Sequence, residues 1–167
     1  HMFFKGTKKR PTAVEIASLI DGLGAEFNAF TSKEYTGFYI KAASSHLELV
    51  SEVLSDMLLN SKFDQEEINR ERNVIAEELR MYLDTPMRYV GDIYEELLYG
   101  DQPLGWDTVG TLESLANIQR EDFLSYNSKF YLGPNMIFVA GGDVNEFRAK
   151  ELAEKYFASL PDRPSPK

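Results

Sequence analysis

The sequence contains no cysteine and only two histidines, His1 and His46. The absence of cysteine excludes disulfide bonds and thiolate metal ligands. A catalytic site that needs several histidines cannot be complete within these 167 residues. His46 is expected in the first turn of a helix, where a lone histidine is usually solvated or bonded locally.

Positive charge is also scarce, since 18 Lys and Arg stand against 27 Asp and Glu, for a net charge of −9. This balance argues against a nucleic-acid partner, because phosphate binding depends on clustered cations. No apolar run approaches the roughly 20 residues that cross a bilayer, so no membrane span is expected. The hydrophobic content of 43% suits a single packed domain.

The sequence does contain a long amphipathic helix, which we expect to run from the N-cap Asp64 to Pro86. Its apolar stripe is Ile68, Ile75, Leu79 and Tyr82, with a second edge at Val74 and Met81. Glu71 and Glu78 lie between those two groups, two turns apart and on one face, whereas Glu77 points to the opposite side. The pair either reaches water or an Arg partner, or it faces a metal ion.

Hydrophobic periodicity and turn signals place the other elements along the chain. Further helices are expected at 12–22, 45–60, 87–98, 111–116, 121–131 and 145–158. An antiparallel hairpin is expected from strands 26–31 and 35–42, and the apolar run 136–141 is typical of a central strand buried on both faces. In the helix 87–98, the residues expected to point inward are Val90, Ile93, Tyr94 and Leu97.

These elements predict an α+β fold, in which a mostly antiparallel sheet packs against several helices. Three strands are few for so many helices, so strand partners are expected to precede residue 1 or to come from another chain. Three prolines within residues 161–167 predict the start of an interdomain linker, which leaves residues 1–160 as the domain.

Several segments, taken together, resemble the pitrilysin–insulinase family of zinc metallopeptidases, which includes mitochondrial processing peptidase. The opening HMFFKGT resembles the end of the family's inverted His-x-x-Glu-His zinc motif, and FNAFT at 27–31 its active-site strand. The segment from Glu71 to Glu78 is similar to the family's distal acidic motif. Gly105, Gly110, Thr111 and the run from Tyr131 to Asp143 follow in the family's order.

The resemblance implies a zinc-dependent peptidase site. His1 and Glu78 match zinc ligands, although His-Met is also a common cloning remnant and His1 is a ligand only if it is native. Glu71 matches the glutamate that orients a ligating histidine. The first histidine ligand and the glutamate general base would lie in the four residues before His1, so we expect an incomplete catalytic half-domain that is inactive alone.

The resemblance also implies partners. A peptide substrate would add as a strand beside Phe27, Asn28, Ala29 and Phe30. From the residues alone, Asn28 and Phe30 would instead be a hairpin residue and a core aromatic. A second half-domain, of the same or a partner chain, would close over the peptide, and a homodimer is compatible with this arrangement.

Two other functions stay open at the level of sequence. One is a non-catalytic structural or substrate-presenting subunit of the same family. The other is an acidic interaction module without a metal, in which Glu71 and Glu78 bind Arg partners. A bacterial cytoplasmic location is expected, with a mitochondrial or exported protein as the alternatives.

Overall fold

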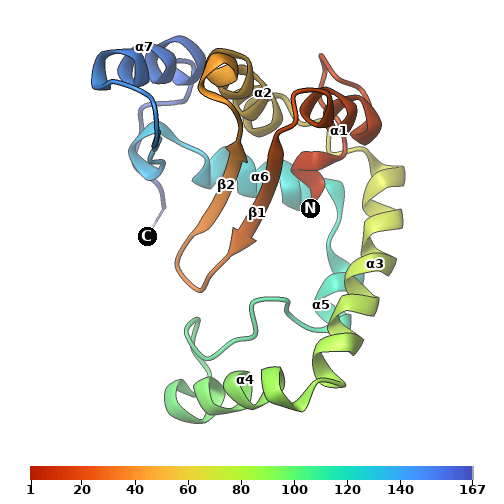
Figure 1. The fold of residues 1–167 in the computed structure, drawn as a ribbon. Coiled ribbons are helices and arrows are strands. Elements are labelled where there is room, and N and C mark those ends of the chain that lie inside the picture. The colour runs from red at the N-terminus through yellow and green to blue at the C-terminus, as the bar shows by residue number, and fades with distance from the viewer. Residues whose placement is uncertain (167) are drawn as a thin grey trace.

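A computed structural model describes residues 1–166 of the protein (Figure 1). The α-helices are α1 Ala13–Gly22, α2 Leu47–Asn60, α3 Gln65–Leu83, α4 Pro86–Tyr99, α5 Leu112–Asn117, α6 Arg120–Phe130 and α7 Glu146–Phe157. The strands are β1 Glu26–Thr31 and β2 Thr36–Lys41, and short 3-10 helices lie at η1 Met2–Phe4, η2 Ser44–His46 and η3 Gly133–Asn135. This arrangement confirms the α+β prediction.

The main core lies between α1, α2 and the hairpin, where Ile16, Ile20, Val53 and Met57 are fully buried. The predicted capping box of α1 is present, because Thr12 accepts from the backbone of Glu15 and the Glu15 carboxylate accepts from that of Thr12. The N-cap predicted at Ser45 is wrong. The chain first makes the 3-10 turn η2, so α2 begins at Leu47 and His46 occupies the N-cap position.

β1 and β2 form the predicted antiparallel hairpin, with Glu26 opposite Lys41 and Thr31 opposite Thr36. Side chains alternate across a strand, so Phe27 and Ala29 share one half-buried face of β1. Phe27 packs on the main core, whereas Asn28 and Phe30 occupy the exposed face. This alternation orients β1 relative to the core.

The long helix is present as α3. Asp64 caps it by accepting from the backbone N–H groups of Glu66 and Glu67. Pro86 follows the end of α3 and is also the first residue of α4. At this position the N–H group that proline lacks would have no partner within the helix. The second apolar edge expected on α3 is not buried, since Val74 and Met81 are both exposed.

The inward face predicted for α4 is wrong. Val90, Ile93, Tyr94 and Leu97 are all exposed, and Leu97 reaches 83%. The opposite, polar face of the helix lies toward the hairpin tip, where Lys33 forms an ion pair with Glu95 at 3.0 Å. The Lys33 ammonium also donates to the carbonyl of Trp106 in the following loop. Periodicity identified the apolar stripe but not the side on which it lies.

The central strand predicted at 136–141 is also wrong for the part of the chain that the structure describes. This segment is not hydrogen-bonded into a sheet, and the two strands of the hairpin form the sheet by themselves within residues 1–166. Ile137 and Val139 are 91% and 81% exposed, whereas Phe138 contacts Phe157 of α7. An apolar run acquires two buried faces only when neighbouring strands and covering helices are in place.

The segment expected to start a linker lies against α6 at its beginning. Gly133 donates its backbone N–H to the carbonyl of Pro161, and the Arg163 guanidinium donates to the carbonyl of Ser128. Lys167, the last residue of the predicted linker, lies outside the described residues. Within those residues, the helices fall short of the length and apolarity needed to cross a bilayer.

Candidate metal centre and peptide-binding strand

The N-terminal turn is held in place by aromatic packing. The ring of Phe3 lies 5.1 Å from that of Phe38 and 5.4 Å from that of Phe63. Met2 is buried with Phe63 and Ile68 in a second core cluster at the start of α3. These contacts fix η1 against α3 and place His1 beside that helix, although the sequence separates them by 70 residues (Figure 1).

Glu71 is buried on α3 and makes two contacts with the N-terminal turn. Its Oε1 lies 2.7 Å from His1 Nδ1, and its Oε2 lies 2.5 Å from Lys5 Nζ. Burial alone would raise the pKa of Glu71, but the hydrogen bonds from Lys5 and His1 outweigh it and hold the pKa below its ordinary value. Glu71 is therefore an ionised carboxylate with both oxygens engaged.

An ionised carboxylate only accepts hydrogen bonds, so the contact with Glu71 requires His1 to carry a proton on Nδ1. In the neutral ring, Nε2 then presents a lone pair. This is the usual arrangement of a metal-ligating histidine, which donates its other ring N–H to a carboxylate.

Glu78 lies two turns further along α3, on the Nε2 side of His1. Its Oε2 is 3.7 Å from Nε2, and its side chain is 38% exposed. Two ligands about 2.1 Å from a tetrahedral zinc ion lie roughly 3.4 Å apart, so the His1 and Glu78 donors fit that ion closely. Glu77 points elsewhere, because its side chain is 73% exposed and pairs with Arg80.

The two donors do not form a complete metal site. Among residues 1–166, no group of three or more His, Cys, Asp or Glu side chains is arranged to hold a metal ion. A catalytic zinc site uses three protein ligands and one open position. The structure thus brings together His1, Glu71 and Glu78, the three residues predicted to form the metal centre.

The predicted peptide-binding residues lie together on β1. One edge of this strand pairs with β2, and no described residue pairs with the other edge. Phe30 is 49% exposed, so it is not the core aromatic that the residues alone suggested. Its ring lies over Gly37, where an added Cβ would come within 2.3 Å of the ring. The exposed face and free edge of β1 are what an added peptide strand requires.

Lys5 is the residue of this site that the sequence analysis missed. The HMFFKGT motif contains it, but the motif by itself assigns no role to this lysine. The available signal was its position four residues after His1, together with a buried carboxylate that needs a cation.

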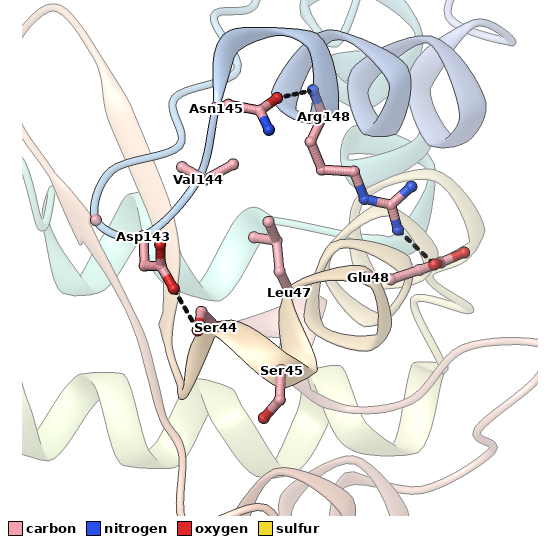
Figure 2. Close-up of a pocket in the computed structure, with 9 residues that line it drawn as sticks. Ser44, Ser45, Leu47, Glu48, Asp143, Val144, Asn145 and Arg148 are labelled. Atoms are coloured by element: carbon pink, nitrogen blue, oxygen red, sulfur yellow. Dashed lines mark hydrogen bonds and ion pairs between the residues drawn. The ribbon is translucent and has the colours of Figure 1, made fainter.

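The structure also contains a pocket between the start of α2 and the loop that leads into α7 (Figure 2). Ser44 donates to Asp143 at 3.1 Å across it, and Arg148 pairs with Glu48 at 2.5 Å. Hydrogen bonds from Lys155 and Arg148 lower the pKa of Glu48 to about 2. None of the predicted site residues lines this pocket.

Comparison with known proteins decides the family. The sequence model of the insulinase family, peptidase family M16, matches residues 1–112, and that of the M16 inactive domain matches residues 117–167. The chain belongs to the insulinase family, M16. This result confirms the resemblance inferred from the motifs.

Curated M16 relatives match nearly the whole chain. The zinc protease YmxG of Bacillus subtilis is 38% identical over 159 residues, which cover 95% of this chain and 38% of the relative. The β subunit of the mitochondrial-processing peptidase of Bos taurus is 36% identical over 157 residues, which cover 94% of this chain and 32% of the relative. The chain thus spans about two-fifths or less of the length of these relatives.

The solved structure of a bacterial protease has the same fold. A protease from Helicobacter pylori aligns with a TM-score of 0.91 and 27% identity, over 100% of this chain and 41% of the other. M16 peptidases are zinc-dependent, and several relatives are named zinc proteases.

Proposed function

We propose that this chain supplies part of the catalytic half of a zinc metalloendopeptidase that cleaves unstructured peptides. His1 and Glu78 would hold the zinc ion, and Glu71 would hold His1. The observation that carries the proposal is the 3.7 Å separation between His1 Nε2 and Glu78 Oε2, with Nδ1 occupied by Glu71.

Each residue has a separate task in this proposal. Glu71 fixes the tautomer and orientation of His1, so that Nε2 is free to bind metal. A bound zinc ion supplies Lewis acidity for polarising a scissile carbonyl and lowers the pKa of water to about 7. Within residues 1–166, His1 and Glu78 are two zinc donors rather than three, and the glutamates beside His1 already have other tasks, so we expect this part of the chain to bind zinc weakly and not to cleave peptides by itself.

β1 would position the substrate. An extended peptide adding to its free edge would gain backbone hydrogen bonds irrespective of sequence, whereas its side chains would meet Asn28 and Phe30 on the exposed face. A second half-domain, from the same chain or a partner, would close over the bound peptide. The relatives are long enough to contain one.

The experiment compares Glu78→Gln with Glu77→Gln in the full-length protein. Glu78→Gln should abolish stoichiometric zinc binding and peptidase activity, because it removes an anionic ligand. Glu77→Gln, one residue away but facing solvent, should change neither. Intact metal content and activity in Glu78→Gln would show that the ligand is assigned wrongly.

A second candidate is a non-catalytic subunit that presents substrates within the same family. It is the alternative because the family also contains an inactive domain, whose sequence model matches residues 117–167. A full-length protein that captures extended peptides on β1, but neither binds zinc nor cleaves them, would support this function over the first.

A further inference from the structure

Lys5 occupies one half of the Glu71 carboxylate. Its Nζ lies 2.5 Å from Oε2, while Oε1 faces His1 Nδ1 at 2.7 Å. The side chain of Glu71 is 8% exposed, so water can supply few hydrogen bonds in place of these two. The two contacts together leave the carboxylate one orientation.

Lys5 is itself held by a rigid turn. Gly6 has φ +120°, and an added Cβ would come within 2.3 Å of the Pro11 carbonyl oxygen, so glycine is required there. The carbonyl of Gly6 accepts from the backbone of Lys62 at 3.1 Å. Thr7 is fully buried and donates to Asp56 of α2 at 2.6 Å. The ammonium group therefore projects from a backbone that is tied to the core.

The buried charge makes this contact consequential. A carboxylate taken out of water needs a counter-charge or several hydrogen bonds. Without Lys5, Glu71 would have His1 as its one remaining partner among the contacts described above. It could then regain solvation by turning away, and a turned carboxylate would no longer define which ring nitrogen of His1 carries the proton.

We propose that Lys5 is a positioning residue of the metal centre, which acts on His1 through Glu71. By holding Oε2, it keeps Oε1 directed at His1 Nδ1 and so keeps Nε2 directed toward Glu78. The inference rests on the proposed function, since it concerns the same site. It adds a cationic side chain behind the orienting glutamate.

The test measures zinc affinity of the full-length protein by competition with a chromophoric chelator. Lys5→Met should weaken zinc binding about 10- to 100-fold, the usual loss when a group supporting a metal ligand is removed. Lys5→Arg, which keeps the charge and the donors, should restore most of the affinity. Lys8→Met removes an exposed lysine of the same segment and should leave the affinity unchanged.

A double-mutant cycle separates positioning from a general structural role. If Lys5 acts through Glu71, Lys5→Met should have no further effect on zinc affinity in a Glu71→Gln background. An equal loss in both backgrounds would overturn the inference, as would unchanged or tighter zinc binding by Lys5→Met. If Lys5→Met does not fold, Lys5→Gln is the neutral variant to which the same criteria apply.

A spectroscopic readout does not depend on bound metal. In the zinc-free protein with ¹⁵N-labelled histidine, His1 should show a proton on Nδ1, and Lys5→Met should convert this signal to a mixture of tautomers. An unchanged His1 spectrum would contradict the inference. Failure of wild-type protein to bind zinc, or undiminished binding by Glu78→Gln, would instead contradict the proposed function.

Discussion

The body of the molecule and its arm are held by different interactions. The body comprises η1, α1, the hairpin, α2 and the first half of α3, and it contains both buried apolar clusters. The arm comprises α4 and the loop at 100–110, and α4 buries no residue. Figure 1 shows the arm extending from the far end of α3, below the hairpin tip. His1, Lys5 and Glu71 therefore belong to the part of the chain that packs, so their geometry has rigid support.

The largest difference in stability between body and arm is expected when apolar side chains are shortened to alanine. Ile20→Ala in the body removes a fully buried side chain from the main core and should destabilise the fold by about 2–5 kcal/mol. Leu97→Ala on the exposed face of α4 should cost no more than about 0.5 kcal/mol. Urea unfolding of the full-length protein measures both. Similar losses would mean that the face of α4 is covered as well as the core is.

Removing an ion pair should likewise cost more stability in the body than on the exposed second half of α3. Arg10 bonds Asp56 at 2.7 Å and also pairs with Glu52, all three being largely buried. Arg10→Met should therefore cost about 3 kcal/mol, because it leaves the buried Asp56 carboxylate without a cation and Glu52 with Lys9 alone. Arg80→Met on the exposed second half of α3 should cost at most about 1 kcal/mol. Thermal unfolding of the two variants tests this. A loss of stability no larger for Arg10→Met than for Arg80→Met would contradict the distinction.

The Arg10 cluster should also make the body sensitive to acid. Burial would raise the pKa of Glu52, but hydrogen bonds from Arg10 and Lys9 outweigh it and lower that pKa. A lowered folded-state pKa contributes stability that is complete above the unfolded value of about 4.3 and is lost as pH falls through the folded value. The stability difference between wild type and Arg10→Met should thus shrink below about pH 4. Urea unfolding measured from pH 7 down to pH 3 provides the check, and a constant difference would refute it.

The smallest effect should come from the link between body and arm. Lys33 at the hairpin tip pairs with Glu95 and donates to the Trp106 carbonyl. Lys33→Met should cost less than about 1 kcal/mol, because the pair is partly exposed. It should nevertheless speed amide hydrogen exchange in the loop at 100–110 while leaving α2 unchanged. Unaltered exchange in that loop would show that Lys33 does not hold the arm.

The local signals in the sequence were sufficient for most elements. The capping box at Thr12, the N-cap at Asp64 and the hairpin at 26–41 all depend on contacts within a few residues, and the structure confirms them. The face shared by Glu71 and Glu78 likewise follows from helical spacing. Such features need no knowledge of the rest of the fold.

The errors concern contacts between distant segments. Periodicity shows that α4 has an apolar side, but the Lys33–Glu95 pair, which joins residues 62 positions apart, turns its polar side to the hairpin. The run at 136–141 has the composition of a buried strand but lacks strand neighbours in the described residues. Lys5 was missed for a related reason, because its partner Glu71 lies 66 residues away.

The central claim is that His1 and Glu78 hold one metal ion. Anomalous diffraction at the zinc edge, from crystals of the zinc-loaded full-length protein, tests it most directly. We predict a single peak about 2.0–2.2 Å from both His1 Nε2 and a Glu78 carboxylate oxygen, with His1 Nδ1 on Glu71. A peak on other residues, or none between His1 and Glu78 at full zinc occupancy, would contradict the account.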